Sequence, residues 1–288
     1  MLVTMINMYR LDSYGYSHVP TLHDMANAFC CAHHDYMNNV DAERLDNYTL
    51  QQLVHQRRTH SVVQINAHDG PLFVHPQSGC LQGDKNADDD FCDVFHIPLL
   101  SWQHWFWTTD PQYYLSYCRC GVFDGLHEIS MCSFVDDLRK LHITDPDAAQ
   151  AAKVLNNSNT TLDNTLQEYG FAQNLDKQVH LPLLKNHAEN RKVSSICKQG
   201  KVADHARYLG RQQSARNSNV PERKNRLRAT TVAWVSMGHF WFTPRLPWKA
   251  RRLVFIAHIQ GTILSGMEAS VLYAIDYAAF DSKNNRLP

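Results

Sequence analysis

The sequence predicts an α+β fold, with strands in the first half of the chain and helices filling its end. Two observations support this prediction. Residues 61–66, 71–75 and 129–135 read as short strands, and the turn residues 67–70 join the first two. Apolar residues recur at helical spacing within 145–170 and again within 221–279. The apolar content of 44% over 288 residues is enough for a buried core.

The first predicted elements are a helix and a hairpin. Leu45, Leu50 and Leu53 give residues 42–59 a helical spacing. Residues 61–66 alternate like a strand, residues 67–70 form a turn, and residues 71–75 return as the second strand. By contrast, the strand that leads into Asp24 looks unsuitable, because Pro20 lacks an N–H and His23 is polar.

The remaining elements follow in the second half. Residues 129–135 form a strand that runs into Asp136 and Asp137. Residues 145–170 form a helix, with Asp145 as its N-cap and Pro146 at its first position. Helices then fill 221–279, with a break near Pro244 and Pro247.

The formal net charge of zero conceals a marked asymmetry. Residues 1–160 hold 9 Lys and Arg against 19 Asp and Glu, whereas residues 161–288 hold 19 against 9. The segment 201–252 alone has 12 basic and 2 acidic residues. A nucleic-acid backbone would bind such a segment, although a solvated helical face would have the same composition.

Two motifs in the first half contain residue types that bind metals or nucleotides. Asp24 ends a strand and Phe29 follows five residues later, and a carboxylate fixed on a strand suits Mg²⁺. In the loop 79–84, Gly79 and Gly83 flank Gln82 and permit a close approach of the backbone to a ligand. Taken alone, each motif is equally typical of a helix cap or a glycine-containing loop.

Three further motifs follow in the second half. Residues 133–137 read Ser-Phe-Val-Asp-Asp, and adjacent acids at a tight turn require neutralising cations. Residues 170–177 read Gly-Phe-Ala-Gln-Asn-Leu-Asp-Lys, and residues 207–210 read Arg-Tyr-Leu-Gly. A solvated turn, a helix C-cap and a helix end are the structural alternatives for these three.

The order of the five motifs resembles the palm of reverse transcriptases of the non-LTR (LINE-type) retrotransposons. The resemblance covers residues 22–270 and extends to Trp234, Trp241, the basic run 249–253 and residues 266–269. It implies a small antiparallel palm sheet backed by helices and followed by a helical thumb. Residues 1–212 would form the palm, including a vestigial N-terminal fingers segment, and residues 213–288 the thumb-like region.

The resemblance also implies roles for individual residues. Asp24, Asp136 and Asp137 would hold two Mg²⁺ ions and carry catalysis. Phe29, Gln82, Gly83 and Lys177 would bind the nucleotide, with Phe29 excluding a ribose 2′-hydroxyl. Tyr208, Leu209 and Gly210 would form the primer grip.

The expected function is RNA-directed DNA polymerase, with an RNA template, a DNA primer and dNTPs as partners. Only 23 residues precede Asp24, and Arg10 is the one basic residue among them, so the cationic contacts of the fingers region are missing. An isolated chain should therefore have little activity, and the alternative is a non-catalytic nucleic-acid-binding remnant. No secretory signal or apolar run of 18 residues is present, which favours an intracellular protein without a membrane span.

Overall fold

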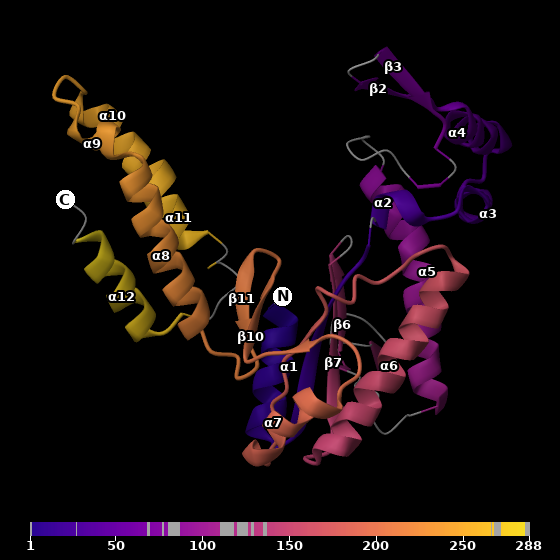
Figure 1. Cartoon of the computed structure of the whole chain (residues 1–288), viewed down its shortest axis with the longest axis horizontal. Coiled ribbons are helices and arrows are strands. Elements are labelled where there is room, and N and C mark those ends of the chain that lie inside the picture. Colours follow the sequence, from indigo (N-terminus) through magenta and orange to yellow (C-terminus); the bar gives the residue numbers. More distant parts are fainter. Residues whose placement is uncertain are drawn as a thin grey trace.

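The centre of the fold is a five-stranded sheet in the order β6-β7-β1-β8-β9 (Figure 1). This computed structural model describes residues 2–26, 28–67, 70–76, 78–79, 87–109, 118–119, 126–127, 130–134, 137–265, 267 and 272–285. The sheet strands are β1 (Ser17–Asp24), β6 (Met131–Phe134), β7 (Asp137–Thr144), β8 (Val179–His180) and β9 (Lys201–Val202). β1 and β7 pair antiparallel along eight residues, whereas β8 and β9 pair in parallel.

The central strand β1 contains the two residues that made it look unsuitable. In a strand, the nitrogen and the carbonyl of one residue point to the same side. The Pro20 carbonyl accepts from the Leu181 N–H at 2.9 Å, so the nitrogen of Pro20 also faces β8 and not β7. β8 pairs with β1 only at Thr21 and Leu22, so the missing donor of Pro20 leaves the β1–β7 ladder intact. His23 is buried and its Nδ1 lies 2.6 Å from Oε1 of Gln173. The sequence-based objection to this strand was therefore wrong.

The two faces of the sheet are covered by different elements. Leu138 packs with Trp102 of α5 (Ala87–Thr109) and Leu162 of α6 (Ala148–Glu168). Leu141, on the opposite face, packs with Met8 of α1 (Leu2–Ser13). The hairpin of β10 (His205–Tyr208) and β11 (Arg211–Ser214) also covers that opposite face, where Tyr208 packs with Leu22 of β1. The N-terminal helix is therefore part of the sheet domain.

The long helix α6 confirms the prediction for 145–170 but corrects its N-terminus. The helix begins at Ala148, and its cap is Asp147, whose Oδ1 accepts from the Gln150 N–H at 3.0 Å. Asp145 is not the cap. The polar run 156–161 stays helical because some of its side chains are buried with partners, as when Asn159 Oδ1 accepts from Gln178 at 2.7 Å.

The segment after β1 contains several short elements. The helix predicted for 42–59 is two helices, α3 (His34–Arg44) and α4 (Tyr48–His60). Asn47 separates them, because its side chain caps α4 by accepting from the Thr49 and Leu50 N–H groups. The predicted hairpin is confirmed as β2 and β3. The bounds here are α2 (Ala28–Cys31), β2 (Val63–Ala67) and β3 (Gly70–Val74).

Helices fill the C-terminal part, as predicted, and a break occurs at Pro244 and Pro247 between α9 (Gly238–Phe242) and α10 (Trp248–Val254). In Figure 1 these helices stand on one side of the sheet, and α2, α3, α4 and the β2–β3 hairpin stand on the other. No helix of the described residues is long and apolar enough to span a bilayer. The remaining elements are β4 (Cys118–Arg119), β5 (Leu126–His127), α7 (His187–Ile196), α8 (Val220–Ser236), α9 (Gly238–Phe242), α10 (Trp248–Val254), the π-helix Phe255–Gln260, α11 (Gly261–Leu264) and α12 (Ala274–Asn284).

Candidate active site

Two of the predicted catalytic acids face each other across the central pair of strands. Asp24 is the last residue of β1, and Asp137 is the first residue of β7 and lies directly opposite it. Side chains of directly opposed residues point to the same face of a sheet. The two carboxylates therefore lie on one face, although more than 100 residues separate them in sequence. Asp136 lies outside the described residues.

The loop that carries Lys177 runs antiparallel to the end of β1. The Ala26 N–H donates to the Ala172 carbonyl at 2.8 Å, and the Asn174 N–H donates to the Asp24 carbonyl at 2.8 Å. These two bonds bring Lys177 Nζ within 3.0 Å of Asp24 Oδ2. The sequence motif that ends in Lys177 is thus joined to the motif that begins at Asp24.

The Tyr-Leu-Gly motif forms the turn between β10 and β11. Leu209 and Gly210 have φ values of +48° and +76°, and two successive left-handed residues are typical of a tight hairpin turn. The buried Tyr208 hydroxyl lies 3.3 Å from the carbonyls of both Cys132 and Asp137. Burial raises the pKa of Tyr208, so its hydroxyl stays protonated and donates to this strand pair.

A buried cation supports Tyr208 from the sheet. The Arg139 guanidinium carbon lies 5.1 Å from the centre of the Tyr208 ring, and its Nη1 donates to Gln213 Oε1 at 2.9 Å. Arg139 has no exposed surface, and this burial lowers its pKa. The cation–π contact and the Gln213 bond together fix the ring on β7, next to Asp137.

A cavity of about 320 Å³ unites these groups. Its ionisable lining is balanced between acids and bases, and sequence reasoning missed the contribution of Lys201 and Arg207. Lys201 belongs to no motif and enters through the parallel pairing of β9 with β8, which the sequence did not indicate. The lining residues are Leu22, His23, Asp24, Asp137, Asp176, Lys177, Val179, Lys201, Arg207 and Tyr208.

The donor chemistry of this cavity fits a magnesium ion. Carboxylate oxygens are the ligands that Mg²⁺ prefers, and Asp24 and Asp137 present them on one face of the sheet. Within the part of the chain that the structure describes, no cluster of three or more His, Cys, Asp or Glu residues is close enough to hold a metal. In this arrangement Lys177 supplies the positive charge beside Asp24.

The predicted nucleotide-binding residues Gln82 and Gly83, and the side chain of Phe29, lie outside what the structure describes. Gly79, three residues before Gln82, is described. Its N–H donates to the Ala32 carbonyl at 2.8 Å, and its own carbonyl lies 3.1 Å from Nε2 of His34. These contacts place the start of the glycine-containing loop beside the short helix that contains Phe29.

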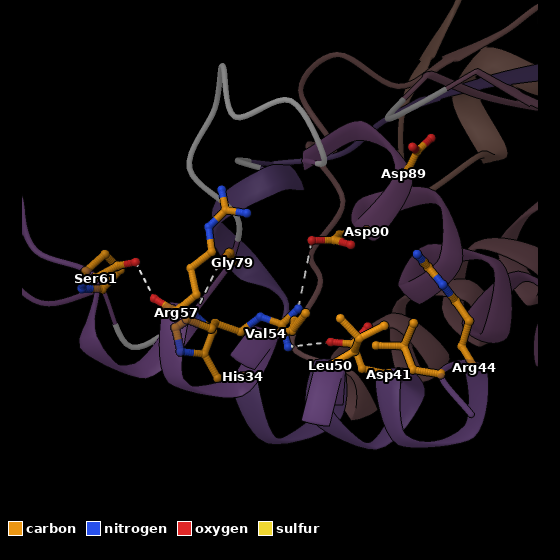
Figure 2. A pocket seen from close by; sticks show the side chains of 13 residues that line it. His34, Asp41, Arg44, Leu50, Val54, Arg57, Ser61, Gly79, Asp89 and Asp90 are labelled. Carbon is orange, nitrogen blue, oxygen red and sulfur yellow. Dashed lines mark hydrogen bonds and ion pairs between the residues drawn. The ribbon is translucent and has the colours of Figure 1, made fainter. Parts of the chain in front are cut away.

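A second cavity, of about 340 Å³, lies over α3 and α4 (Figure 2). Arg58 lies under it and is nearly buried, with Asp41 at 2.9 Å and Asp90 at 3.9 Å. Arg44 forms an ion pair with Asp93. These pairs neutralise much of the charge around the cavity, which indicates a structural cluster of ion pairs rather than an anion-binding site.

Comparison with solved structures identifies the fold. The chain is similar to telomerase from Candida albicans in complex with a TWJ fragment of telomeric RNA, with a TM-score of 0.52, 11% identity, and coverage of 99% of this chain and 43% of that chain. It is also similar to telomerase from Candida tropicalis in complex with a TWJ fragment of telomeric RNA, with a TM-score of 0.50, 10% identity, and coverage of 100% and 52%. No family model and no curated protein matches the sequence.

These similarities establish the fold alone, because the identities are low. The chain spans about half the length of the telomerase chains that it matches. A telomerase-like fold is compatible with a palm followed by a thumb, as the sequence predicted.

Proposed function

We propose that this chain is the palm and thumb of an RNA-directed DNA polymerase of the non-LTR retrotransposon type. The observation that carries the proposal is the pair of Asp24 and Asp137, opposed across β1 and β7, with Lys177 and Tyr208 at the same cavity. Five motifs in the order of that family and a telomerase-like fold support it.

The proposal gives each group a role in nucleotidyl transfer. Asp24, Asp136 and Asp137 would hold two Mg²⁺ ions, which supply activation of the primer 3′-hydroxyl and stabilisation of the leaving pyrophosphate. Lys177 would leave Asp24 when a metal binds there and would contact the triphosphate. Arg207 would contribute a second cation to that contact.

The other predicted residues would position the substrates. Phe29 would exclude a ribose 2′-hydroxyl, and Gln82 and Gly83 would line the template and nucleotide pocket. The turn of Leu209 and Gly210, anchored through Tyr208 on Asp137, would hold the primer end.

The first test is binding of Mn²⁺, as a paramagnetic probe for Mg²⁺, measured on the wild-type chain and two variants. Asp137→Asn removes a metal ligand at nearly constant size and should weaken binding at least tenfold, because hard cations require carboxylate charge. Lys177→Met removes the competing cation and should strengthen binding. Equal Mn²⁺ affinity in all three proteins would contradict the proposal.

The second test is primer extension on a primed RNA template with Mg²⁺. In enzymes, losing one preorganised transition-state donor costs on the order of 2.7–4 kcal/mol, and absent cationic contacts to the triphosphate should cost a comparable amount. We therefore expect little or no extension, and any that occurs should vanish in Asp137→Asn. Binding of primed template without metal binding at Asp137 would favour the non-catalytic nucleic-acid-binding remnant instead.

A further inference from the structure

The C-terminal helices enclose a further cavity, which is distinct from the one that Asp24 and Asp137 line. A cavity of about 700 Å³ lies between α8, α9, α10 and the π-helix, and this volume is typical of ligand-binding clefts. We call it the aromatic cleft, and define it by Trp234, Trp241, Phe242, Trp248, Arg251 and Arg252.

The aromatic cleft has a rigid part and an exposed part. The rings of Trp234 and Trp241 stack at 4.5 Å with an interplanar angle of 7°, and Trp241 Nε1 donates to the Trp234 carbonyl at 3.0 Å. Trp248 and Phe242, in contrast, are 74% and 71% exposed. Exposed apolar side chains that gather beside a cavity are typical of binding surfaces.

The charge of the aromatic cleft is positive. Arg251 and Arg252 line it, and Glu268 is the one acidic residue of the sequence between Glu222 and Asp276. Arg251 Nη2 donates to the Thr243 carbonyl at 2.5 Å, but its Nε is buried and has no partner among the described residues. A buried donor of this kind requires an acceptor. The ligand should therefore combine flat apolar rings with negative charge.

We propose that the aromatic cleft binds unpaired nucleotides of a single-stranded nucleic acid. The bases would stack on the exposed rings of Trp248 and Phe242, and the phosphates would accept hydrogen bonds from Arg251 and Arg252. A duplex does not fit this chemistry, because its base faces already stack on one another. An apolar protein helix fits poorly, because it would bury the two guanidinium groups without counter-charges. This proposal does not depend on the polymerase proposal.

The test measures anisotropy of labelled single-stranded RNA and DNA oligonucleotides of one sequence, with a blunt duplex of that sequence as a third ligand. Trp248→Ala should weaken binding of both single strands by about fivefold to 150-fold, which is the range for loss of one base–aromatic stack. Duplex binding should be unchanged. Trp248→Phe keeps a stacking ring and should bind single strands nearly as well as the wild type.

The matched control is Leu253→Ala, which removes an apolar side chain that is 68% exposed on the same helix but lies outside the aromatic cleft. It should leave the affinities for all three ligands unchanged. Circular dichroism verifies that each variant is folded. Equal effects of Trp248→Ala and Leu253→Ala, or an equal loss of duplex and single-strand binding, would overturn the proposal.

Three further measurements separate nucleotide binding in the aromatic cleft from self-association and from metal binding at the cavity of Asp24 and Asp137. Arg252→Ala should reduce the magnitude of the negative slope of log affinity against log salt by about 0.7, as expected for one lost phosphate contact. A concentration-dependent dimer that Trp248→Ala disrupts, without a change in oligonucleotide affinity, would refute the proposal in favour of self-association. Mn²⁺ binding should be unchanged in Trp248→Ala, so failure here is separable from failure at Asp137.

Discussion

Gly170 determines, at the scale of one residue, whether the loop carrying Lys177 can pass the start of α3. Its φ is +85°, and a Cβ added there would lie 2.1 Å from Cδ2 of His33 and 2.8 Å from the Cys31 carbonyl oxygen. We predict that Gly170→Ala lowers the free energy of unfolding by more than the ~1–2 kcal/mol expected for a left-handed backbone alone. Urea unfolding measures this difference.

Gly210 provides the matched control for that prediction. Its φ is +76°, but no atom lies within 4 Å of an added Cβ. Gly210→Ala should therefore show only the conformational cost. If both substitutions destabilise the protein equally, the prediction that close packing of the Gly170 loop against α2 and α3 adds to the cost is wrong.

The convergence of four residues at the candidate site was predictable where a motif fixed their order along the chain. Asp24, Asp137, Lys177 and Tyr208 were all named from the sequence, and they line one cavity. Lys201 was not, because its position depends on the pairing of a two-residue strand, and so short a strand has no periodicity to detect.

At the scale of elements, burial rather than pattern explains where prediction failed. The strand β1 was doubted because of Pro20 and His23, yet the fold places the proline beside a short partner strand and pairs the histidine with Gln173. The hairpin of β2 and β3 and the helical C-terminus were predictable, because turn residues and 3.6-residue spacing mark them directly. The split between α3 and α4 depended on one cap, Asn47.

The sheet also has a pH dependence that follows from its buried histidines. Burial lowers the pKa of His23 to about 3 and that of His180 to about 4, against an ordinary value of 6.5. His180 Nε2 lies 2.9 Å from the Gln199 carbonyl and therefore carries its proton, while Nδ1 lies 2.9 Å from the Thr21 hydroxyl and accepts from it. Protonation of Nδ1 would place a positive charge in this buried site, and that desolvation cost keeps the ring neutral in the folded state.

The sign of the effect follows from proton counting. Between pH 6.5 and about 4, the unfolded chain binds a proton at His180 that the folded chain excludes. The contribution of each such histidine to the free energy of unfolding is therefore fully present above pH 6.5. It should fall by about 1.4 kcal/mol per pH unit as the pH decreases through this window. His180→Gln, which keeps a polar side chain, should reduce that slope in urea unfolding at successive pH values. His205→Gln, at an exposed position of β10, should leave the slope unchanged, and an identical slope in all three proteins would contradict the prediction.

At the scale of the whole molecule, the charge asymmetry of the sequence becomes an asymmetry of surfaces. The acidic first part contributes Asp24 and Asp137 to the sheet, and the basic segment 201–252 continues from the β10–β11 hairpin into the C-terminal helices of Figure 1. Eight of its 12 cations are exposed. Others are bound internally, as Arg223 is to Asp276 at 2.6 Å and Arg226 is to Glu222 at 2.5 Å.

The exposed cations predict nucleic-acid binding that is mainly electrostatic. Each phosphate contact releases a counterion, so the log of the affinity for a primed RNA template should fall linearly with log salt, with a slope of about −0.9 per contact for a duplex. The double variant Lys224→Ala, Arg228→Ala removes two exposed cations of α8 and should reduce the magnitude of the slope by up to roughly 1.8. Lys153→Ala, an exposed position on α6 outside the basic segment, is the matched control and should not change the slope. Binding that is independent of salt, or a loss in the α6 variant as large as in the α8 variant, would show that the basic segment is only a solvated face.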